Sequence, residues 1–586
     1  MSAFQGTALV LAALAVAVRL VGRQHRLLHL LQLEHYENAR LRLWLRRRGE
    51  RWQPRELVAA TALFAGAVAA QAAGSVWASG ALLLLTTPLA ALGVADWRRE
   101  AVKPLIFTGR ARRLLRLTVF PPALLVVAAL RIAILGPSTA SLGILLAVAL
   151  ALLALAPETL LVANVLLRPV QRGINNRYVS RARTILRRLD PTVIGITGSY
   201  GKTTTKFCVG SVLEQDRPTL VTPESYNSLL GVVRTINENM RDEHEAFVVE
   251  MGMFRRGDIT ELCELVHPTV GVITAIGPMH LERLGSIEAI AAAKGELLDA
   301  LPPDGEFVTN ADDPRCVELA ARAHVPVTLF GIAGGDGASS VTRAGAPAGM
   351  AAPAPPGQAP PTSTPNRAPE APPSKKRSVD VQVIARNVRL AEGRTCFELL
   401  LDGPDSEPIP VSAGLLGRHN VSNLLAAAAV GRALGLAPER IAAGLESVTA
   451  PAHRLQPIPN RAAGVVVIDD AYNSNPDGAA AALEVLRQHP AARRLLVTPG
   501  MVELGELEAQ CNRAFGEQAA PACDLAILVG AARTDPIREG MLAAGMDPAA
   551  VHVVRDISEA TALLARTTRA GDVVLFENDL PDTYAA

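Results

Sequence analysis

The chain has 586 residues, 49% of them hydrophobic, and its 58 basic and 56 acidic side chains leave a formal net charge of +2. This balance argues against a nucleic-acid-binding protein, because such proteins carry a marked basic excess. The six cysteines are scattered without paired spacing, which argues against a disulfide framework or a zinc ribbon and is typical of a reduced compartment.

The first 170 residues contain five apolar stretches, at about 4–21, 57–73, 76–95, 117–135 and 140–156. Each approaches the roughly 20 residues that a bilayer-crossing helix needs, so we predict a transmembrane helical domain over 1–170 with about five spans. A cleaved signal peptide is disfavoured, because no basic segment precedes the first stretch. Arginine-rich segments separate the stretches, and the positive-inside rule places them in the cytoplasm. The sequence therefore predicts a multi-pass protein of a bacterial-type inner (cytoplasmic) membrane, with its catalytic part in the cytoplasm.

A glycine-rich turn follows the strand-like stretch 192–197 and contains Gly198, Ser199, Tyr200, Gly201, Lys202, Thr203 and Thr204. Backbone N–H groups of such a turn can cradle phosphates, Lys202 can meet the outer phosphate charge, and Thr203 can ligate Mg²⁺. The spacing departs from the common G-x-x-x-x-G-K-[ST] form, in which the first glycine would stand at position 196. That position is Ile196, and the glycine, Gly195, lies one place earlier. An ordinary strand–turn–helix corner also fits the motif taken alone. The motif nevertheless favours ATP and Mg²⁺ as cofactors.

Apolar strands alternate with helices after this turn and again from residue 465, a pattern that indicates parallel sheets covered by helices. The roughly 400 residues after the apolar stretches are too many for one core. We predict a central α/β domain at 180–450 and a second α/β domain at 451–586. The Ala-, Pro- and Gly-rich run 334–378 interrupts the central domain and is predicted to be a disordered insertion, because it cannot bury enough apolar surface.

Further motifs follow the glycine-rich turn in a fixed order. They are Glu250-Met-Gly, Thr274 to Glu282, Ala293-Lys-Gly-Glu296, Asn310 to Pro314, Gly417 to Asn423, Ala452-His-Arg454 and Asp469 to Pro476. Together these resemble the Mur ligase family over about residues 190–576, and the last motif, with Tyr226 to Gly231, resembles its MurF-like branch. The resemblance implies a P-loop central domain and a Rossmann-like C-terminal domain. It also implies an ATP-dependent carboxylate–amine ligase that acts through an acyl phosphate in peptidoglycan precursor synthesis.

The resemblance implies four catalytic residues, which are Lys202, Glu250, His280 and Lys294. Lys202 would stabilise charge on the transferred phosphate, and Thr203 and Glu250 would bind one Mg²⁺. His280 would bind a second Mg²⁺, although imidazole is an unusual Mg²⁺ ligand and the histidine taken alone would be structural. Lys294 would be carbamylated by CO₂ and help to hold Mg²⁺, although a single lysine is by default a solvated surface residue.

The resemblance also implies nucleotide contacts further along the chain. Asn310, Asn420 and Asn423 match family positions near the adenine, while Arg454 and Asp470 match positions that reach phosphate and ribose from the last domain. Taken singly, the asparagines would be turn or cap residues. Because Arg454 lies near the boundary between the domains, closure of the domains would assemble the site.

Two departures limit the identification of the substrate. MurF-like proteins carry an N-terminal domain that binds the uridine nucleotide, whereas membrane helices are expected in its place here. The family's basic Lys-Gly-Ser-Arg-like run is replaced by Glu577-Asn578-Asp579. The expected partners are therefore a carboxylate donor, free or lipid-linked, and an amino-acid or peptide amine, with no nucleic acid. Two alternatives stay open: a membrane-anchored ligase for another polymer such as poly-γ-glutamate, and a non-catalytic ATP-binding scaffold.

Overall fold

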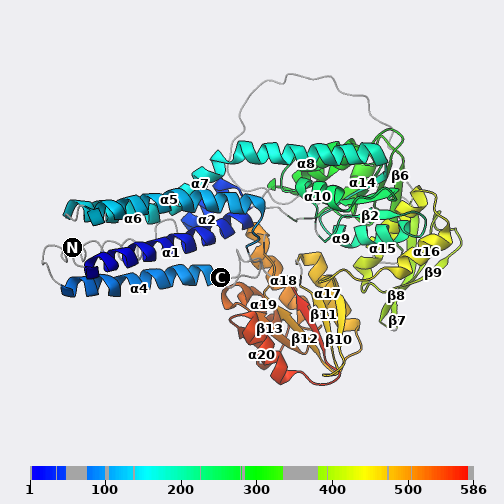
Figure 1. Cartoon of the computed structure of the whole chain (residues 1–586). Coiled ribbons are helices and arrows are strands. Elements are labelled where there is room, and N and C mark those ends of the chain that lie inside the picture. The colour runs from blue at the N-terminus through cyan, green and yellow to red at the C-terminus, as the bar shows by residue number, and fades with distance from the viewer. Residues whose placement is uncertain are drawn as a thin grey trace, which may run out of the picture. The chain divides into compact units, whose positions relative to one another are not determined.

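The computed structural model describes residues 3–34, 36–47, 62, 76–98, 105–135, 139–224, 226–277, 279, 284–333, 381–391, 393–471, 474–502 and 504–578. The chain separates into two compact units, one of residues 1–176 with 581–586 and the other of residues 177–580 (Figure 1). In its described part the first unit is helical, and the second combines helices with two sheets.

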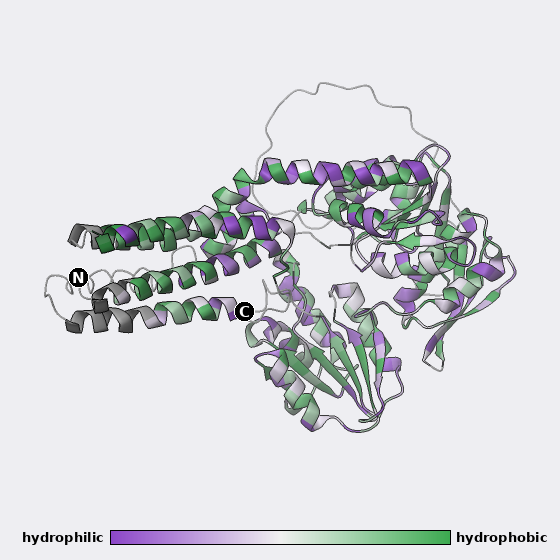
Figure 2. Cartoon of the chain, viewed as in Figure 1, coloured by the Kyte–Doolittle hydropathy of each residue, from purple (hydrophilic) through white to green (hydrophobic). Residues whose placement is uncertain are grey.

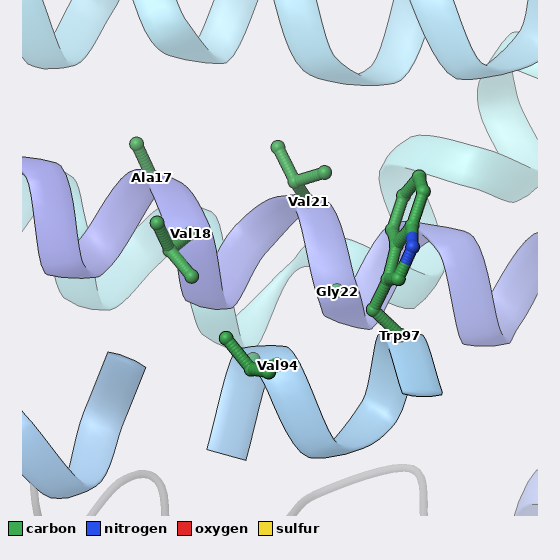
Figure 3. A pocket seen from close by; sticks show the side chains of 7 residues that line it. Ala17, Val18, Val21, Gly22, Val94 and Trp97 are labelled. Atoms are coloured by element: carbon green, nitrogen blue, oxygen red, sulfur yellow. The ribbon is translucent and has the colours of Figure 1, made fainter. Parts of the chain in front are cut away.

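The helical unit contains α1 (Ala3–Leu33), α2 (Asn38–Arg47), α4 (Val76–Arg98), α5 (Gly109–Leu135), α6 (Thr139–Ala154) and α7 (Ala156–Leu166). Helix α8 (Arg168–Leu189) follows and runs across the boundary between the units. Helices α1 and α4 approach so closely at Gly22 and Gly93 that a Cβ on either glycine would overlap the backbone of the other helix. Beside this crossing lies an apolar pocket that contains no predicted site residue and is lined by Ala17, Val18, Val21, Gly22, Gly93, Val94 and Trp97 (Figure 3).

The prediction of a multi-pass membrane protein with about five spans is wrong. Among the described residues, Gly109–Leu135 is the one helix long and apolar enough to cross a membrane, and a bent pair, 147–154 with 156–166, adds a second only if both halves form one span. These halves meet at 64° and are each shorter than the roughly 20 residues that a span needs. The predicted span 57–73 lies outside the described residues, apart from Ala62.

The sequence did not reveal that charged side chains are buried and paired within this helical unit. Helix α1 buries Arg19 and Arg23, each 2% exposed. Arg19 Nη1 lies 2.5 Å from Asp96 Oδ2 of α4, and Arg26 Nη1 lies 3.2 Å from Asp96 Oδ1. Arg23 and Arg26, which sequence reasoning treated as topology signals between spans, therefore pack within the helical unit. Figure 2 shows how strongly hydrophobic residues nevertheless dominate α5.

The α/β unit begins with a nine-stranded sheet in the order β2-β3-β1-β4-β5-β6-β7-β8-β9. Its strands are β1 (Thr192–Thr197), β2 (Thr219–Val221), β3 (Ala246–Glu250), β4 (Val270–Ile273), β5 (Glu306–Asn310), β6 (Val327–Ile332), β7 (Val381–Ala391), β8 (Arg394–Leu400) and β9 (Ile409–Ala413). Strands β1 to β7 pair in parallel, while β8 and β9 add an antiparallel edge. The carboxyl ends of β1, β3 and β4 therefore lie side by side, where parallel sheets bind ligands.

Helices cover both faces of this sheet. One hydrophobic core joins it to α9 (Lys202–Leu213), α15 (Arg418–Ala433) and α16 (Pro438–Ser447). The other core joins it to the second half of α8 and to α10 (Leu229–Asn239), α11 (Asp258–Val266), α13 (Ile287–Asp299) and α14 (Pro314–Ala320). The two cores explain why the central strands are apolar throughout, because each strand is buried on both sides.

A six-stranded sheet follows, in the order β10-β11-β15-β12-β13-β14. Its strands are β10 (Gln456–Asn460), β11 (Val465–Asp470), β12 (Arg494–Thr498), β13 (Leu525–Val529), β14 (Val551–Val554) and β15 (Val573–Glu577), and only β10 is antiparallel to its neighbour. The helices between the strands are α17 (Pro476–Gln488), α18 (Glu508–Ala519), α19 (Ala531–Ala543) and α20 (Ile557–Thr567). The two predicted α/β folds are thus confirmed.

The predicted insertion, 334–378, lies outside the described residues. On either side of it, β6 pairs directly with β7, so the chain re-enters the same sheet. The domain boundaries at 170, 180, 450 and 451 stay a prediction.

Candidate active site

The glycine-rich turn connects β1 to α9 at the edge of the nine-stranded sheet. Gly198 and Gly201 have φ angles of 154° and 77°. A Cβ would overlap the Thr274 hydroxyl at the first position and the Asn423 side chain at the second, so both positions require glycine. The turn leads directly into the N-terminus of a 12-residue helix, which is an arrangement that binds phosphate groups.

Other residues of the turn anchor it to the segment after β4. Ser199 Oγ accepts a hydrogen bond from Gly277 N at 2.9 Å and donates one to Gly277 O at 3.0 Å. The carbonyl of Tyr200 accepts a hydrogen bond from the Thr274 hydroxyl. Thr204, at the start of α9, is buried. These contacts fix the shape of the turn on which the predicted phosphate site depends.

Lys202 folds back over the turn, where its Nζ donates hydrogen bonds to Gly198 O at 2.7 Å and to Ser199 O at 3.4 Å. Burial lowers the pKa of Lys202, the Glu250 carboxylate opposes this shift, and the Arg454 cation adds to it. The turn, the helix N-terminus and this side chain together offer N–H donors and a cation of the kind that binds an anion.

Glu250 ends β3, is 1% exposed, and is the central carboxylate of the site. Its Oε2 accepts a hydrogen bond from Thr203 Oγ1 at 3.0 Å, and its Oε1 accepts one from Asn227 Nδ2 at 3.0 Å. Burial alone would raise the pKa of Glu250, but the cations of Lys206 and Lys202 hold it below its ordinary value. The carboxylate and the Thr203 hydroxyl therefore offer adjacent oxygen ligands beside the phosphate site, which suits Mg²⁺.

Lys294 lies on α13 and is only 2% exposed. Burial lowers its pKa well below the ordinary value, and the nearby Lys202 cation adds to the effect. The Lys202 cation thus influences the pKa of both Glu250 and Lys294. His280 lies outside the described residues, and no group of three or more His, Cys, Asp and Glu side chains suited to a metal occurs within the described part.

The three predicted adenine-site asparagines are buried and held by internal contacts. Asn310 Nδ2 donates to Thr274 O at 3.2 Å, and Asn310 Oδ1 accepts from Asp312 N at 2.9 Å. Asn420 and Asn423 are joined through an Nδ2–Oδ1 hydrogen bond of 2.9 Å at the start of α15. The structure therefore places Asn423, and through it Asn420, against the glycine-rich turn.

Arg454 and Asp470 lie at the junction with the six-stranded sheet. Asp470 ends β11, and its Oδ1 accepts a hydrogen bond from Leu455 N at 3.1 Å. Burial raises the pKa of Asp470 to about 6, with the Arg454 cation opposing the shift. The Arg454 cation also contributes to lowering the pKa of Lys202 and Lys206.

The model of the Mur ligase middle domain matches residues 196–346, and that of the Mur ligase glutamate ligase domain matches residues 453–577. The chain is 31% identical over 388 residues to UDP-N-acetylmuramoyl-tripeptide--D-alanyl-D-alanine ligase of Synechocystis sp., covering 66% of this chain and 71% of that protein. It is 32% identical over 404 residues to the ligase of the same name from Mycobacterium leprae, covering 66% and 70%. This chain belongs to the Mur ligase family.

The solved structures agree with this assignment. The crystal structure of MurF from Acinetobacter baumannii superposes with a TM-score of 0.55 at 26% identity, covering 70% of this chain and 78% of the other. The expected MurF-like, ATP-dependent, amide-forming ligase is thereby confirmed. Both family models begin after the helical unit, so the Mur ligase part is the α/β unit.

Two site residues of this Mur ligase were missed from the sequence. Lys206 is fully buried, and its Nζ lies 3.0 Å from Glu250 Oε2. Asn227 contacts the other oxygen of the same carboxylate. The signal for Lys206 was its position one helical turn after Lys202, which places both side chains on the same face of α9.

Proposed function

We propose that this Mur ligase joins the carboxylate of a UDP-muramoyl tripeptide to the amine of D-alanyl-D-alanine in peptidoglycan precursor synthesis. The observation that carries the chemistry is the cluster of Lys202, Thr203 and Glu250 at the carboxyl end of the central strands. The names of the relatives from Synechocystis sp. and Mycobacterium leprae supply the two substrates. The proposal thus rests on a site built for phosphoryl transfer and on a family that forms amide bonds.

In the first step, the donor carboxylate attacks the γ-phosphorus of ATP, the bond to the β-phosphate oxygen breaks, and ADP and an acyl phosphate result. The turn amides and Lys202 hold the phosphates and neutralise the charge that develops on them. Thr203 and Glu250 would hold Mg²⁺, which supplies further charge neutralisation when bound. In the second step, the neutral amine attacks the acyl carbon, inorganic phosphate leaves and the amine loses a proton.

Lys294 would serve the same site as a carbamate. Its lowered pKa favours the neutral amine, which is the form that can add to CO₂. The addition would release a proton and turn this buried neutral amine into an anionic oxygen ligand near Lys202. The same proposal includes a second Mg²⁺ at His280 and the predicted domain boundaries. It also includes nucleotide contacts from Asn310, Asn420, Asn423, Arg454 and Asp470.

The identity of the acceptor amine is inferred from the names of the relatives alone. One observation favours a different amine. Glu577 ends β15, is 1% exposed, and accepts hydrogen bonds from the Ser474 and Thr498 hydroxyls, the latter at 2.9 Å. A buried carboxyl group at the carboxyl edge of the six-stranded sheet would disfavour an acceptor with its own carboxylate there. The second candidate is therefore a ligase of the same chemistry that uses another acceptor amine.

A product assay separates the two candidates. The full chain is incubated with Mg²⁺, ATP, bicarbonate and UDP-muramoyl tripeptide, and with D-alanyl-D-alanine, single amino acids or amino-acid amides as acceptors. We expect a mass-shifted product and equimolar phosphate with D-alanyl-D-alanine. Product only with amides or single amino acids would establish the second candidate, and phosphate release with no acceptor preference would contradict both.

A further inference from the structure

Lys206 is a buried cation that the proposed mechanism does not use. It lies on α9 one turn after Lys202, and its side chain is 0% exposed. Burial lowers its pKa, while the Glu250 carboxylate opposes that shift. A lysine is almost never buried this completely without a charged partner, so its partners indicate its role.

The first partner is the proposed metal ligand. Lys206 Nζ lies 3.0 Å from Glu250 Oε2, the oxygen that also accepts the Thr203 hydroxyl at 3.0 Å. The other oxygen, Oε1, accepts Asn227 Nδ2 at 3.0 Å. Three donors from two segments, α9 and the segment after β2, therefore fix the plane of the carboxylate, and Lys206 supplies the charged one.

The second partner is the segment after β2, which the structure describes at residues 222–224 and 226–228. Lys206 Nζ donates a hydrogen bond to the carbonyl of Glu224, a non-glycine residue with a φ of 43°. The same segment is attached to the end of β3 at two further points: Glu250 N donates to Thr222 Oγ1 at 3.1 Å, and Gly252 N donates to Asn227 O at 2.8 Å. Lys206 thus joins the phosphate-binding helix, the β3 carboxylate and this segment.

We propose that Lys206 is a positioning residue that aims Glu250 at the metal site and holds the described residues of the segment after β2 against it. The proposal rests on the proposed metal role of Glu250. A purely electrostatic role makes the opposite prediction, because an ammonium group beside a metal ligand repels Mg²⁺ and its removal would tighten metal binding. The direction of the change in Mg²⁺ affinity therefore separates positioning from repulsion.

The test measures by calorimetry how binding of the non-hydrolysable ATP analogue adenylyl imidodiphosphate to the full chain depends on Mg²⁺. This binding measurement requires no knowledge of the carboxylate donor or the acceptor amine. In Lys206→Met, we expect the Mg²⁺ concentration for half-saturation to rise about tenfold or more, as the loss of a charge-assisted hydrogen bond predicts. Lys206→Arg, which retains the charge and the donors, should restore most of the affinity. Unchanged or tighter Mg²⁺ dependence in Lys206→Met would overturn the proposal.

Two further variants make the result unambiguous. Glu250→Gln should weaken the Mg²⁺ dependence at least as much, and no effect there would overturn the metal role of Glu250, whatever Lys206 does. Cys208→Ala, a buried change on the same helix, should lower thermal stability but leave the Mg²⁺ dependence unchanged. If Lys206→Met does not fold, Lys206→Gln replaces it under the same criteria, and a second failure to fold would identify Lys206 as a core residue and contradict the positioning role.

Discussion

Asn423 Oδ1 accepts a hydrogen bond of 3.0 Å from Thr205 Oγ1, although 218 residues separate the two in sequence. Asn423 lies in the first turns of α15, while Thr205 lies in the first turn of α9, and both side chains are buried. The same asparagine oxygen occupies the space that a Cβ on Gly201 would need. Helix α15, distant in sequence, therefore packs against the glycine-rich turn through Asn423.

Asn423→Ala should weaken ATP binding and lower stability together. The change leaves the buried Thr205 hydroxyl without its acceptor, which costs about 1–3 kcal/mol, and it removes the support of the turn. We expect a lower thermal midpoint and a clear rise in the Kd for adenylyl imidodiphosphate. Asn239→Ala, an exposed change at the end of α10, is the matched control and should leave the Kd unchanged. An unchanged Kd in Asn423→Ala would contradict the supporting role.

Thr203→Ala should reduce turnover far more than stability. The substitution removes a hydroxyl that is positioned by Glu250 and is proposed to bind Mg²⁺, so we expect a loss of about 10²-fold in kcat, as for other groups that stabilise developing charge. Thr203→Ser retains the hydroxyl and should keep most of the activity. Equal activity of the alanine and serine variants, measured by phosphate release, would exclude the hydroxyl as a ligand.

Glu577→Gln should alter how stability depends on pH. Burial raises the pKa of Glu577 from 4.5 to about 7, with the Asp470 carboxylate adding to the shift and the Ser474 hydrogen bond opposing it. A carboxyl group whose pKa is higher in the folded than in the unfolded protein contributes to the free energy of unfolding at a pH below its unfolded pKa. That contribution is lost as the pH rises through the pKa of the folded protein. The wild type should lose roughly 2–3 kcal/mol of unfolding free energy between pH 4.5 and 7 from this group.

The glutamine variant cannot ionise and should show a flatter profile over the same range in urea unfolding. Some slope will remain, because the pKa of Asp470 is also raised, to about 6. Glu439→Gln, an exposed change on α16, should follow the wild-type curve. Parallel profiles for wild type and Glu577→Gln would show that Glu577 does not carry the effect.

Lys294→Ala should abolish any dependence of activity on bicarbonate. If the neutral amine of Lys294 takes up CO₂, wild-type phosphate release should fall in bicarbonate-depleted buffer and recover when bicarbonate is added. The alanine variant should be weakly active and indifferent to bicarbonate. A wild-type enzyme whose rate is the same in both buffers would contradict the carbamate.

Much of the α/β unit could be predicted because its signals are local. The turn from Gly198 to Thr204 is visible in the glycine spacing, and apolar strands buried on both faces read as continuous runs. The ordered motifs that resemble Mur ligases were confirmed by the family match. Lys206 and Asn227 were missed because their roles arise from contacts with Glu250, which only the paired strands β1 and β3 and the segment after β2 bring together.

The N-terminal prediction failed for a physical reason. Apolar stretches were counted as spans by length and hydropathy, which carry no information about Arg19 and Asp96 pairing within a helical bundle. His280 and the middle of the motif from Asp469 to Pro476 lie outside the described residues. Their roles stay predictions.

Transfer of an oxygen isotope tests the central claim that this enzyme forms an amide through an acyl phosphate. UDP-muramoyl tripeptide is labelled with ¹⁸O at both oxygens of its terminal carboxylate and incubated with the full chain, Mg²⁺, ATP, bicarbonate and D-alanyl-D-alanine. The masses of the released phosphate and of the peptide product are then measured by mass spectrometry. We expect one ¹⁸O in each inorganic phosphate released, one ¹⁸O retained in the new amide, and neither product with Lys202→Ala. Unlabelled phosphate, ¹⁸O in AMP, or full activity in Lys202→Ala would contradict this claim.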